Sequence, residues 1–113
     1  MVTITETNDK FIFEINGFHK FWALRSDIVV PKENIVKAYQ DTNELHKYPG
    51  FRVGTYLPFV IIAGDFFLRK KKNFWDVMKE RDTIIVELKD HSYHKLYIQV
   101  KNPEEALHLL NTK

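Results

Sequence analysis

Cysteine is absent from this chain of 113 residues. Its absence excludes disulfides, thiolate metal sites and a cysteine nucleophile. Glycine and proline are also few, with four of each, and they form no flexible linker. We therefore expect a single domain over residues 1–113, which is long enough to bury one core without disulfides or bound metal ions.

Long apolar runs are also missing. The longest mostly apolar stretch, Tyr56 to Ala63, is interrupted by Pro58 and is far shorter than the roughly 20 residues of a membrane-spanning helix. The N-terminal residues Met1 to Glu6 lack the basic and apolar regions of a signal peptide. From these absences we expect a cytoplasmic protein.

Net charge is small, at +2, but its distribution is uneven. Residues 69–81 carry six basic and two acidic side chains, whereas the other residues carry eleven basic and thirteen acidic ones. The basic character is therefore local. A broad nucleic-acid-binding surface is disfavoured, because such a surface needs basic residues over a wider area.

Strand patterns dominate the chain. Residues 83–89 and 95–101 alternate apolar and polar side chains on either side of a polar turn, Asp90 to His94. Residues 54–68 indicate two strand pieces with a bend between them, and Arg69 to Asn73 indicates a charged turn. Further strands are predicted at residues 11–15, 19–24, 28–30, 35–40 and 74–78.

One helix, at about residues 103–112, is predicted to end the chain. Asn102 is a favourable N-cap, Pro103 suits the first helical position, and Glu105 completes a pattern like a capping box. The next residues place Ala106, Leu107 and Leu110 on one apolar face. So short a helix is marginal alone, so we expect it to dock on the sheet. Together these patterns predict a mainly β (α+β) protein with about seven or eight strands and one C-terminal helix.

Several blocks of residues are similar to the small bacterial pleckstrin-homology-like (PH-like) proteins, over about residues 17–110. The more specific blocks are Gly54-Thr55-Tyr56-Leu57-Pro58 with Ala63-Gly64, and Phe74-Trp75-Asp76-Val77. The weaker ones are Ala23-Leu24-Arg25, Ile28-Val29-Val30-Pro31 with Ile35, Thr83 to Leu88 with Asp90, and Asn102-Pro103-Glu104.

The resemblance implies a half-open barrel of two near-orthogonal antiparallel sheets, capped by the C-terminal helix. It implies no established activity. The chain departs from the family pattern at Phe59, where a glycine is expected, and in its basic turn at 69–72. The early turns of the chain are not basic, so the resemblance does not extend to phosphoinositide binding.

The leading functional hypothesis is a binding or assembly module that contacts a protein partner, including a second copy of itself. The apolar segment Tyr56–Ile62 would form a sheet edge that pairs with another subunit. Adjacent strand residues face opposite ways, so one of Phe74 and Trp75 is expected to point outward. The predicted interaction surface is Tyr56, Phe59, Ile61, Phe74 and Trp75.

The alternative hypothesis is peripheral binding to anionic membrane lipid, because clustered Lys and Arg attract anionic headgroups. The basic run from Arg69 to Lys72 can instead be a solvated turn with no binding role. The predicted anion or lipid patch is Arg69, Lys70, Lys71, Lys72, Lys79 and Arg81.

Residues with catalytic or metal-binding chemistry are sparse. His91 and His94, with Asp90, are the candidate metal or small-molecule ligands, but a plain polar turn is the better interpretation. Asp65 and Asp76 flank the basic run and could pair as acid and base. No phosphate loop, nucleophile elbow or dinucleotide fingerprint accompanies them. We expect no enzyme activity, no metal and no cofactor.

Overall fold

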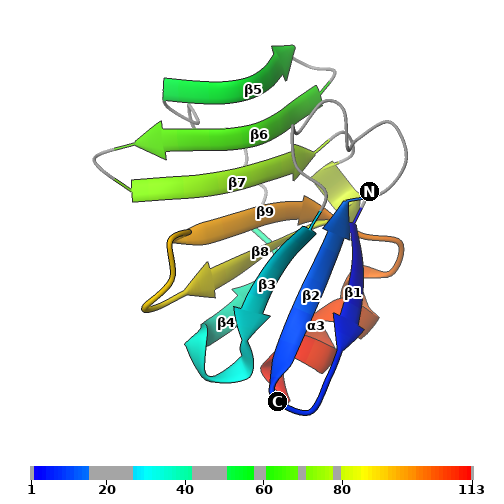
Figure 1. Ribbon diagram of the computed structural model, residues 1–113. Helices are drawn as coiled ribbons and strands as arrows, with labels where there is room; N and C mark the ends of the chain where they lie inside the picture. Colours follow the sequence, from blue (N-terminus) through cyan, green and yellow to red (C-terminus); the bar gives the residue numbers. More distant parts are fainter. Residues whose placement is uncertain are drawn as a thin grey trace.

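The computed structural model describes residues 2–15, 27–41, 51–57, 61–68, 71–77 and 80–112. Within these ranges the chain forms nine strands, two short 3₁₀ helices and one α-helix (Figure 1). The strands are β1 (Val2–Glu6), β2 (Lys10–Ile15), β3 (Asp27–Pro31), β4 (Ile35–Tyr39), β5 (Phe51–Leu57), β6 (Ile61–Leu68), β7 (Lys71–Val77), β8 (Thr83–Leu88) and β9 (Lys95–Gln99). The helices are the 3₁₀ turns Lys32–Asn34 and Glu80–Asp82, and α3 (Pro103–Asn111).

The strands form two sheets. The smaller has three antiparallel strands in the order β1-β2-β3, and the larger has six in the order β4-β8-β9-β7-β6-β5. In Figure 1 the strands of the smaller sheet run across the direction of those in the larger one. No strand pairing joins the two sheets within the described ranges, so they form two layers and not a closed barrel.

Two sequence-based expectations need correction. The larger sheet is mixed, because β9 lies between β7 and β8 and pairs with β7 in parallel. The predicted charged turn from Arg69 to Asn73 is also too long. The β6–β7 ladder extends to the pair Leu68–Lys71, so Lys71 to Asn73 belong to β7. The predicted strand at residues 19–24 lies outside the described residues.

The main core fills the space between the two sheets. Phe11, Phe13 and Val30 from the smaller sheet pack with Ile84 and Leu96 from the larger, and all five are fully buried. A second buried cluster occupies the other face of the six-stranded sheet, where Trp75, Val77, Ile85 and Tyr97 lie. Both faces of this sheet are therefore covered in its central strands, which explains why their sequences are nearly continuously apolar.

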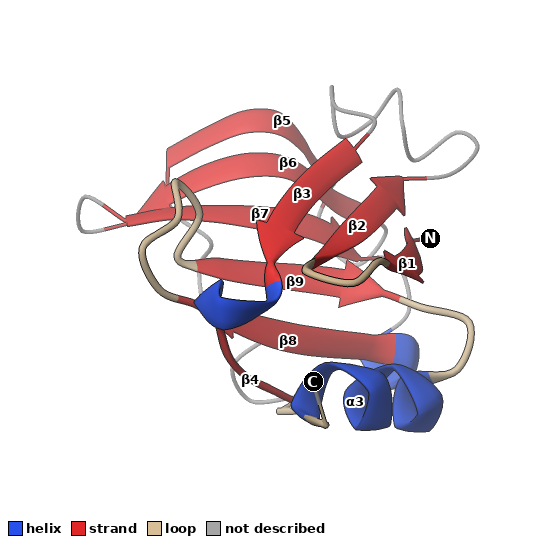
Figure 2. Cartoon of the chain, turned by 60° about the horizontal axis from the view of Figure 1, so that its bottom comes forward, coloured by secondary structure: helices blue, strands red, loops and turns tan. Residues whose placement is uncertain are grey.

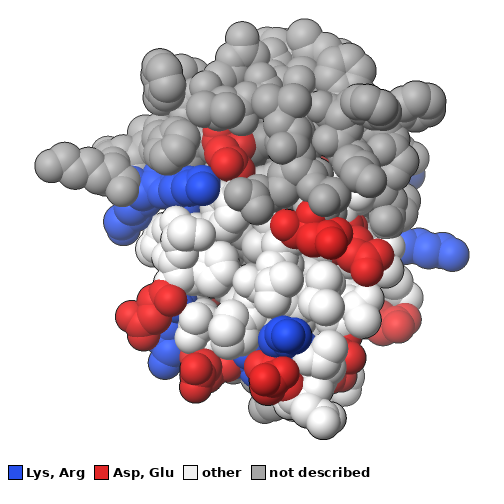
Figure 3. All heavy atoms as spheres, in the orientation of Figure 1, with Lys and Arg blue, Asp and Glu red and all other residues white. Residues whose placement is uncertain are grey.

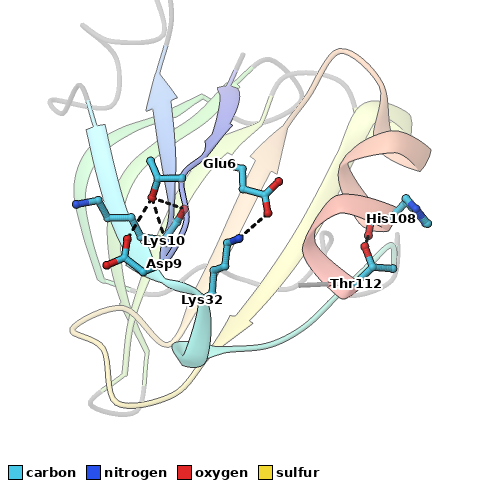
Figure 4. Close-up of polar contacts among 7 residues, drawn as sticks. Glu6, Asp9, Lys10, Lys32, His108 and Thr112 are labelled. Atoms are coloured by element: carbon cyan, nitrogen blue, oxygen red, sulfur yellow. Dashed lines mark hydrogen bonds and ion pairs between the residues drawn. The ribbon is translucent and has the colours of Figure 1, made fainter.

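Helix α3 confirms the predicted capping and docking. The Asn102 side chain accepts a hydrogen bond from the Glu105 N–H, and Pro103 occupies the first turn. Ala106 and Leu110 are buried while Leu107 is partly buried, and the helix packs against β4 and β8 (Figure 2). At its end the Thr112 hydroxyl donates to the His108 carbonyl, 2.6 Å away (Figure 4).

An ion pair holds the short connection between the smaller sheet and β4. Lys32, in the first 3₁₀ turn, forms an ion pair of 2.6 Å with Glu6 at the end of β1 (Figure 4). In the turn between β1 and β2, the Thr7 hydroxyl contacts both the Asp9 carboxylate and the Lys10 carbonyl (Figure 4). These contacts hold the end of the smaller sheet at which the chain crosses to the larger one.

Candidate functional site

The predicted interaction segment Tyr56–Ile62 includes the end of β5 and the start of β6. β5 is the last strand of the six-stranded sheet, whereas β6 is an interior strand, so only the β5 part of the segment lies at the edge (Figure 1). β5 pairs with β6 in a continuous antiparallel register from Phe51–Phe67 to Leu57–Ile61. Tyr56 and Ile61 therefore lie in the last two residue pairs of this ladder, next to the β5–β6 connection. Phe59 lies outside the described residues. No described strand pairs with the other side of β5.

The opposite edge of the same sheet is closed by a side chain. The Asn111 amide at the end of α3 accepts from the Ala38 N–H and donates to the Ala38 carbonyl, both at 2.9 Å. An amide side chain thus makes the two backbone bonds that a neighbouring strand would make. Farther along, the Gln40 amide donates to the Arg81 and Thr83 carbonyls. The Asn111 contacts make the outer edge of β4 less available for pairing with another chain, whereas the Gln40 contacts join the end of β4 to the start of β8.

The smaller sheet shows the same arrangement. His91, in the β8–β9 turn, contacts the Val29 carbonyl of β3 through Nε2 at 3.0 Å. Its Nδ1 accepts from the Tyr93 N–H, so the ring proton must be on Nε2, which donates to Val29. The ring therefore joins the β8–β9 turn to the smaller sheet. At the other end, no described strand pairs with the outer side of β1.

Neither Phe74 nor Trp75 is exposed, although one of the two was expected to point outward. Phe74 is fully buried in the main core, and Trp75, at 2% exposure, is buried in the second cluster. Trp75 stacks on Tyr97, its neighbour across the parallel ladder, with ring centroids 3.9 Å apart. The two residues do face opposite ways, but both faces of the sheet are covered at this point. The expectation of an outward aromatic was therefore wrong.

The basic residues of the predicted anion patch have different environments in the structure. Lys72 lies over the Tyr93 ring, 4.5 Å from its centroid, and 3.6 Å from the Asp65 carboxylate. Tyr93 itself donates a 2.6 Å hydrogen bond to the other Asp65 oxygen. Lys72 is thus engaged within the fold, whereas Lys71 and Arg81 are exposed. Arg69, Lys70 and Lys79 lie outside the described residues.

Asp65 and Asp76 lie on one face of the larger sheet. Asp65 is opposite Phe74 in the β6–β7 ladder, and Asp76 is two residues farther along β7. Their environments differ: Asp65 is held by Tyr93 and Lys72, while Asp76 is fully buried. The contacts of Asp65 join β6 to β7 and to the β8–β9 turn, so this carboxylate has a structural role.

The histidine turn brings together fewer ligands than a metal site needs. His91 uses both ring nitrogens in contacts with backbone groups. No cluster of three or more His, Asp or Glu side chains suited to a metal ion occurs in the part of the chain that the structure describes. His94 contributes through its backbone, donating to the Lys72 carbonyl and accepting from the Leu88 N–H. The turn from Asp90 to His94 is confirmed as the β8–β9 connection.

Sequence reasoning missed two residues that matter at the edges. Asn111 carried no signal beyond its place near the helix end, and its partner Ala38 is 73 residues away. Tyr93 was interpreted as an ordinary turn residue, yet it is 2% exposed and contacts Asp65, Lys72 and Phe74. An aromatic residue within a polar turn was the available signal, because such a residue often packs back onto the core.

Comparison with known proteins finds no matching family model, no matching curated protein and no matching solved structure. The PH-like resemblance therefore remains a prediction. Among the described residues, no helix is long and apolar enough to cross a membrane.

Proposed function

We propose that the chain is a non-enzymatic, PH-like binding and assembly module that associates with a second copy of itself through β5. The PH-like assignment is supported by the two sheet layers and the C-terminal helix. One observation carries the functional part. The six-stranded sheet is closed at β4 by Asn111, but β5 at its other end has no further described strand beside it.

The composition of β5 suits this role. Natural edge strands avoid pairing by being short, by carrying charged residues or by containing proline. β5 has seven residues, a single charged one at Arg52 and no proline before Pro58. The N–H and C=O groups on the outer side of β5, beside which no strand is described, can pair with the same strand from a second copy, and antiparallel pairing of identical strands gives a closed two-fold dimer.

The test is to place proline at two successive positions of β5 and to measure the solution mass of each variant. Successive residues of a strand direct their N–H groups to opposite sides, so only one of Arg52→Pro and Val53→Pro removes a bond to β6. The other removes an outward N–H and should leave the melting temperature nearly unchanged. We expect the wild type to be a dimer by light scattering at both low and high salt, and the thermally tolerated proline variant to be a monomer.

Two results would contradict self-association. One is a wild-type monomer at every salt concentration, and the other is a dimer that survives both prolines. Salt is the useful variable because screening weakens contacts between exposed charges, while an apolar strand edge holds or strengthens.

Binding to anionic membrane is the second candidate, favoured by the exposure of Lys71 and Arg81. The engagement of Lys72 by Asp65 leaves fewer cations for headgroups. Flotation with phosphatidylserine vesicles separates the two candidates. Binding that disappears in Lys71→Gln with Arg81→Gln, while the mass remains that of a monomer, would support the membrane alternative in place of assembly.

A further inference from the structure

Helix α3 supplies the group that occupies the outer side of β4. Asn111, the last residue of the helix, accepts from the Ala38 N–H and donates to the Ala38 carbonyl. In an antiparallel ladder the N–H and C=O of one residue point to the same side. Both groups of Ala38 therefore point away from β8, its neighbour in the sheet, and a strand added at this edge would have to displace the Asn111 amide.

Three further features of β4 are among those that natural proteins use to prevent pairing at a sheet edge. The strand has only five residues, its register with β8 shifts between Ile35 and Lys37, and Lys37 is exposed. β5, at the opposite end of the same sheet, has seven residues, a continuous register with β6 and one charged residue, Arg52. The features that discourage pairing are therefore found at β4 and not in the length, register or composition of β5.

General charge repulsion does not supply this protection. The net charge of the chain is only +2, and Figure 3 shows acidic and basic side chains interspersed over the described part of the face that it draws. A net charge far from zero is what keeps copies of a protein apart. The groups at the β4 edge itself therefore decide whether two copies pair there.

We infer that β4 is a second pairing surface for this chain and that Asn111, by closing it, limits assembly to two copies. β5 and β4 lie at opposite ends of one sheet, so a dimer joined through β5 has a β4 edge at each of its two ends. With those edges open, one dimer can add to the next, and the sheet grows without closing. The limit of two copies rests on the proposed pairing through β5, whereas the closure of β4 rests on the Asn111 contacts.

The experiment compares Asn111→Ala with Asn111→Asp in the full chain, by sedimentation velocity over increasing protein concentration. Alanine leaves both Ala38 backbone groups without the amide. Aspartate still accepts from the Ala38 N–H and adds a charge at the edge, which disfavours pairing. We expect the wild type and Asn111→Asp to remain dimers, and Asn111→Ala to reach at least twice the dimer mass as the concentration rises.

The same two variants control for loss of stability. Both lose the hydrogen bond to the Ala38 carbonyl, so both should unfold at similar urea concentrations. Assembly that appears with alanine and not with aspartate is therefore a property of the edge and not of partial unfolding. A further variant combines Asn111→Ala with the thermally tolerated proline in β5. This variant should form a dimer and nothing larger, because β4 is then the edge that remains open.

Two results would overturn the inference. One is an Asn111→Ala mass equal to the wild-type mass at every concentration, and the other is equal growth of Asn111→Ala and Asn111→Asp. A wild-type monomer together with an Asn111→Ala dimer would refute the pairing through β5, and with it the limit of two copies, but would support the closure of β4. The failures of the two proposals are therefore distinguishable in one set of measurements.

Discussion

Replacing Asn111 tests the closure of the β4 edge most directly. Its amide makes two hydrogen bonds of 2.9 Å to the Ala38 backbone, both partly buried. A typical hydrogen bond contributes about 0.5–1.5 kcal/mol, so the pair contributes about 1–3 kcal/mol. Alanine is the better helix former, which returns up to ~0.6 kcal/mol. Asn111→Ala should therefore lower the free energy of unfolding by about 1–2 kcal/mol.

Urea unfolding followed by circular dichroism measures this loss, and an unchanged m-value would show that the unfolding transition is otherwise the same. Asn111→Asp sharpens the result, because a carboxylate can accept from the Ala38 N–H but cannot donate to the Ala38 carbonyl. We expect Asp to be as destabilising as Ala. Asn102→Ala, at the other end of α3, is the control for helix capping alone and should cost about 1 kcal/mol. A loss below ~0.5 kcal/mol in both Asn111 variants would refute the closure.

The core and the basic run give two further predictions from unfolding measurements. Leu110→Ala should cost about 2–4 kcal/mol because Leu110 is fully buried, and Leu107→Ala, partly exposed, should cost clearly less; equal losses would contradict the observed helix face. Lys72→Gln should cost up to about 1 kcal/mol through its contacts with Asp65, whereas Lys71→Gln should change stability by less than ~0.5 kcal/mol; the reverse order would show that the exposed lysine is the structural one.

Local patterns predicted the elements of the fold well. The alternation of residues 83–89 and 95–101 corresponds to β8 and β9, and the cap at Asn102 marks the observed helix start. These features depend on residues close in the chain. The parallel pairing of β7 with β9 does not, because it depends on which strand enters the space between β7 and β8. A repeating pattern of apolar residues carries no information on that order.

The candidate site was predicted less well, for a physical reason. The argument for an outward Phe74 or Trp75 assumed a sheet with one solvated face, which is usual for antiparallel sheets. Here the central strands are buried on both faces, so alternation cannot identify an exposed aromatic. Lys72 likewise resembled its neighbours in the sequence, and only the fold places it beside Tyr93 and Asp65.

The four terminal strands of the two sheets divide into two kinds. At β4 and β3, side chains from distant segments bind the edge backbone: Asn111 at Ala38, and His91 at Val29. Beside β5 and β1 the structure describes no neighbouring strand on the outer side. Since a long edge with few charges is a template for another chain, β5 is the strand at which a partner is expected.

The β5 and β1 edges differ in how well they suit pairing with another chain. β5 carries one charged residue in seven and pairs along its whole length with β6, so an identical strand can add to it over a comparable length. β1 has five residues and ends in Glu6, whose carboxylate forms an ion pair with Lys32, so it offers a shorter and less suitable edge. Charge contacts weaken as salt rises, whereas apolar strand pairing does not. A salt titration of the solution mass should therefore leave β5 pairing intact, and a dimer that dissociates as salt rises would mean that charged contacts, and not the apolar strand edge, hold the two copies together.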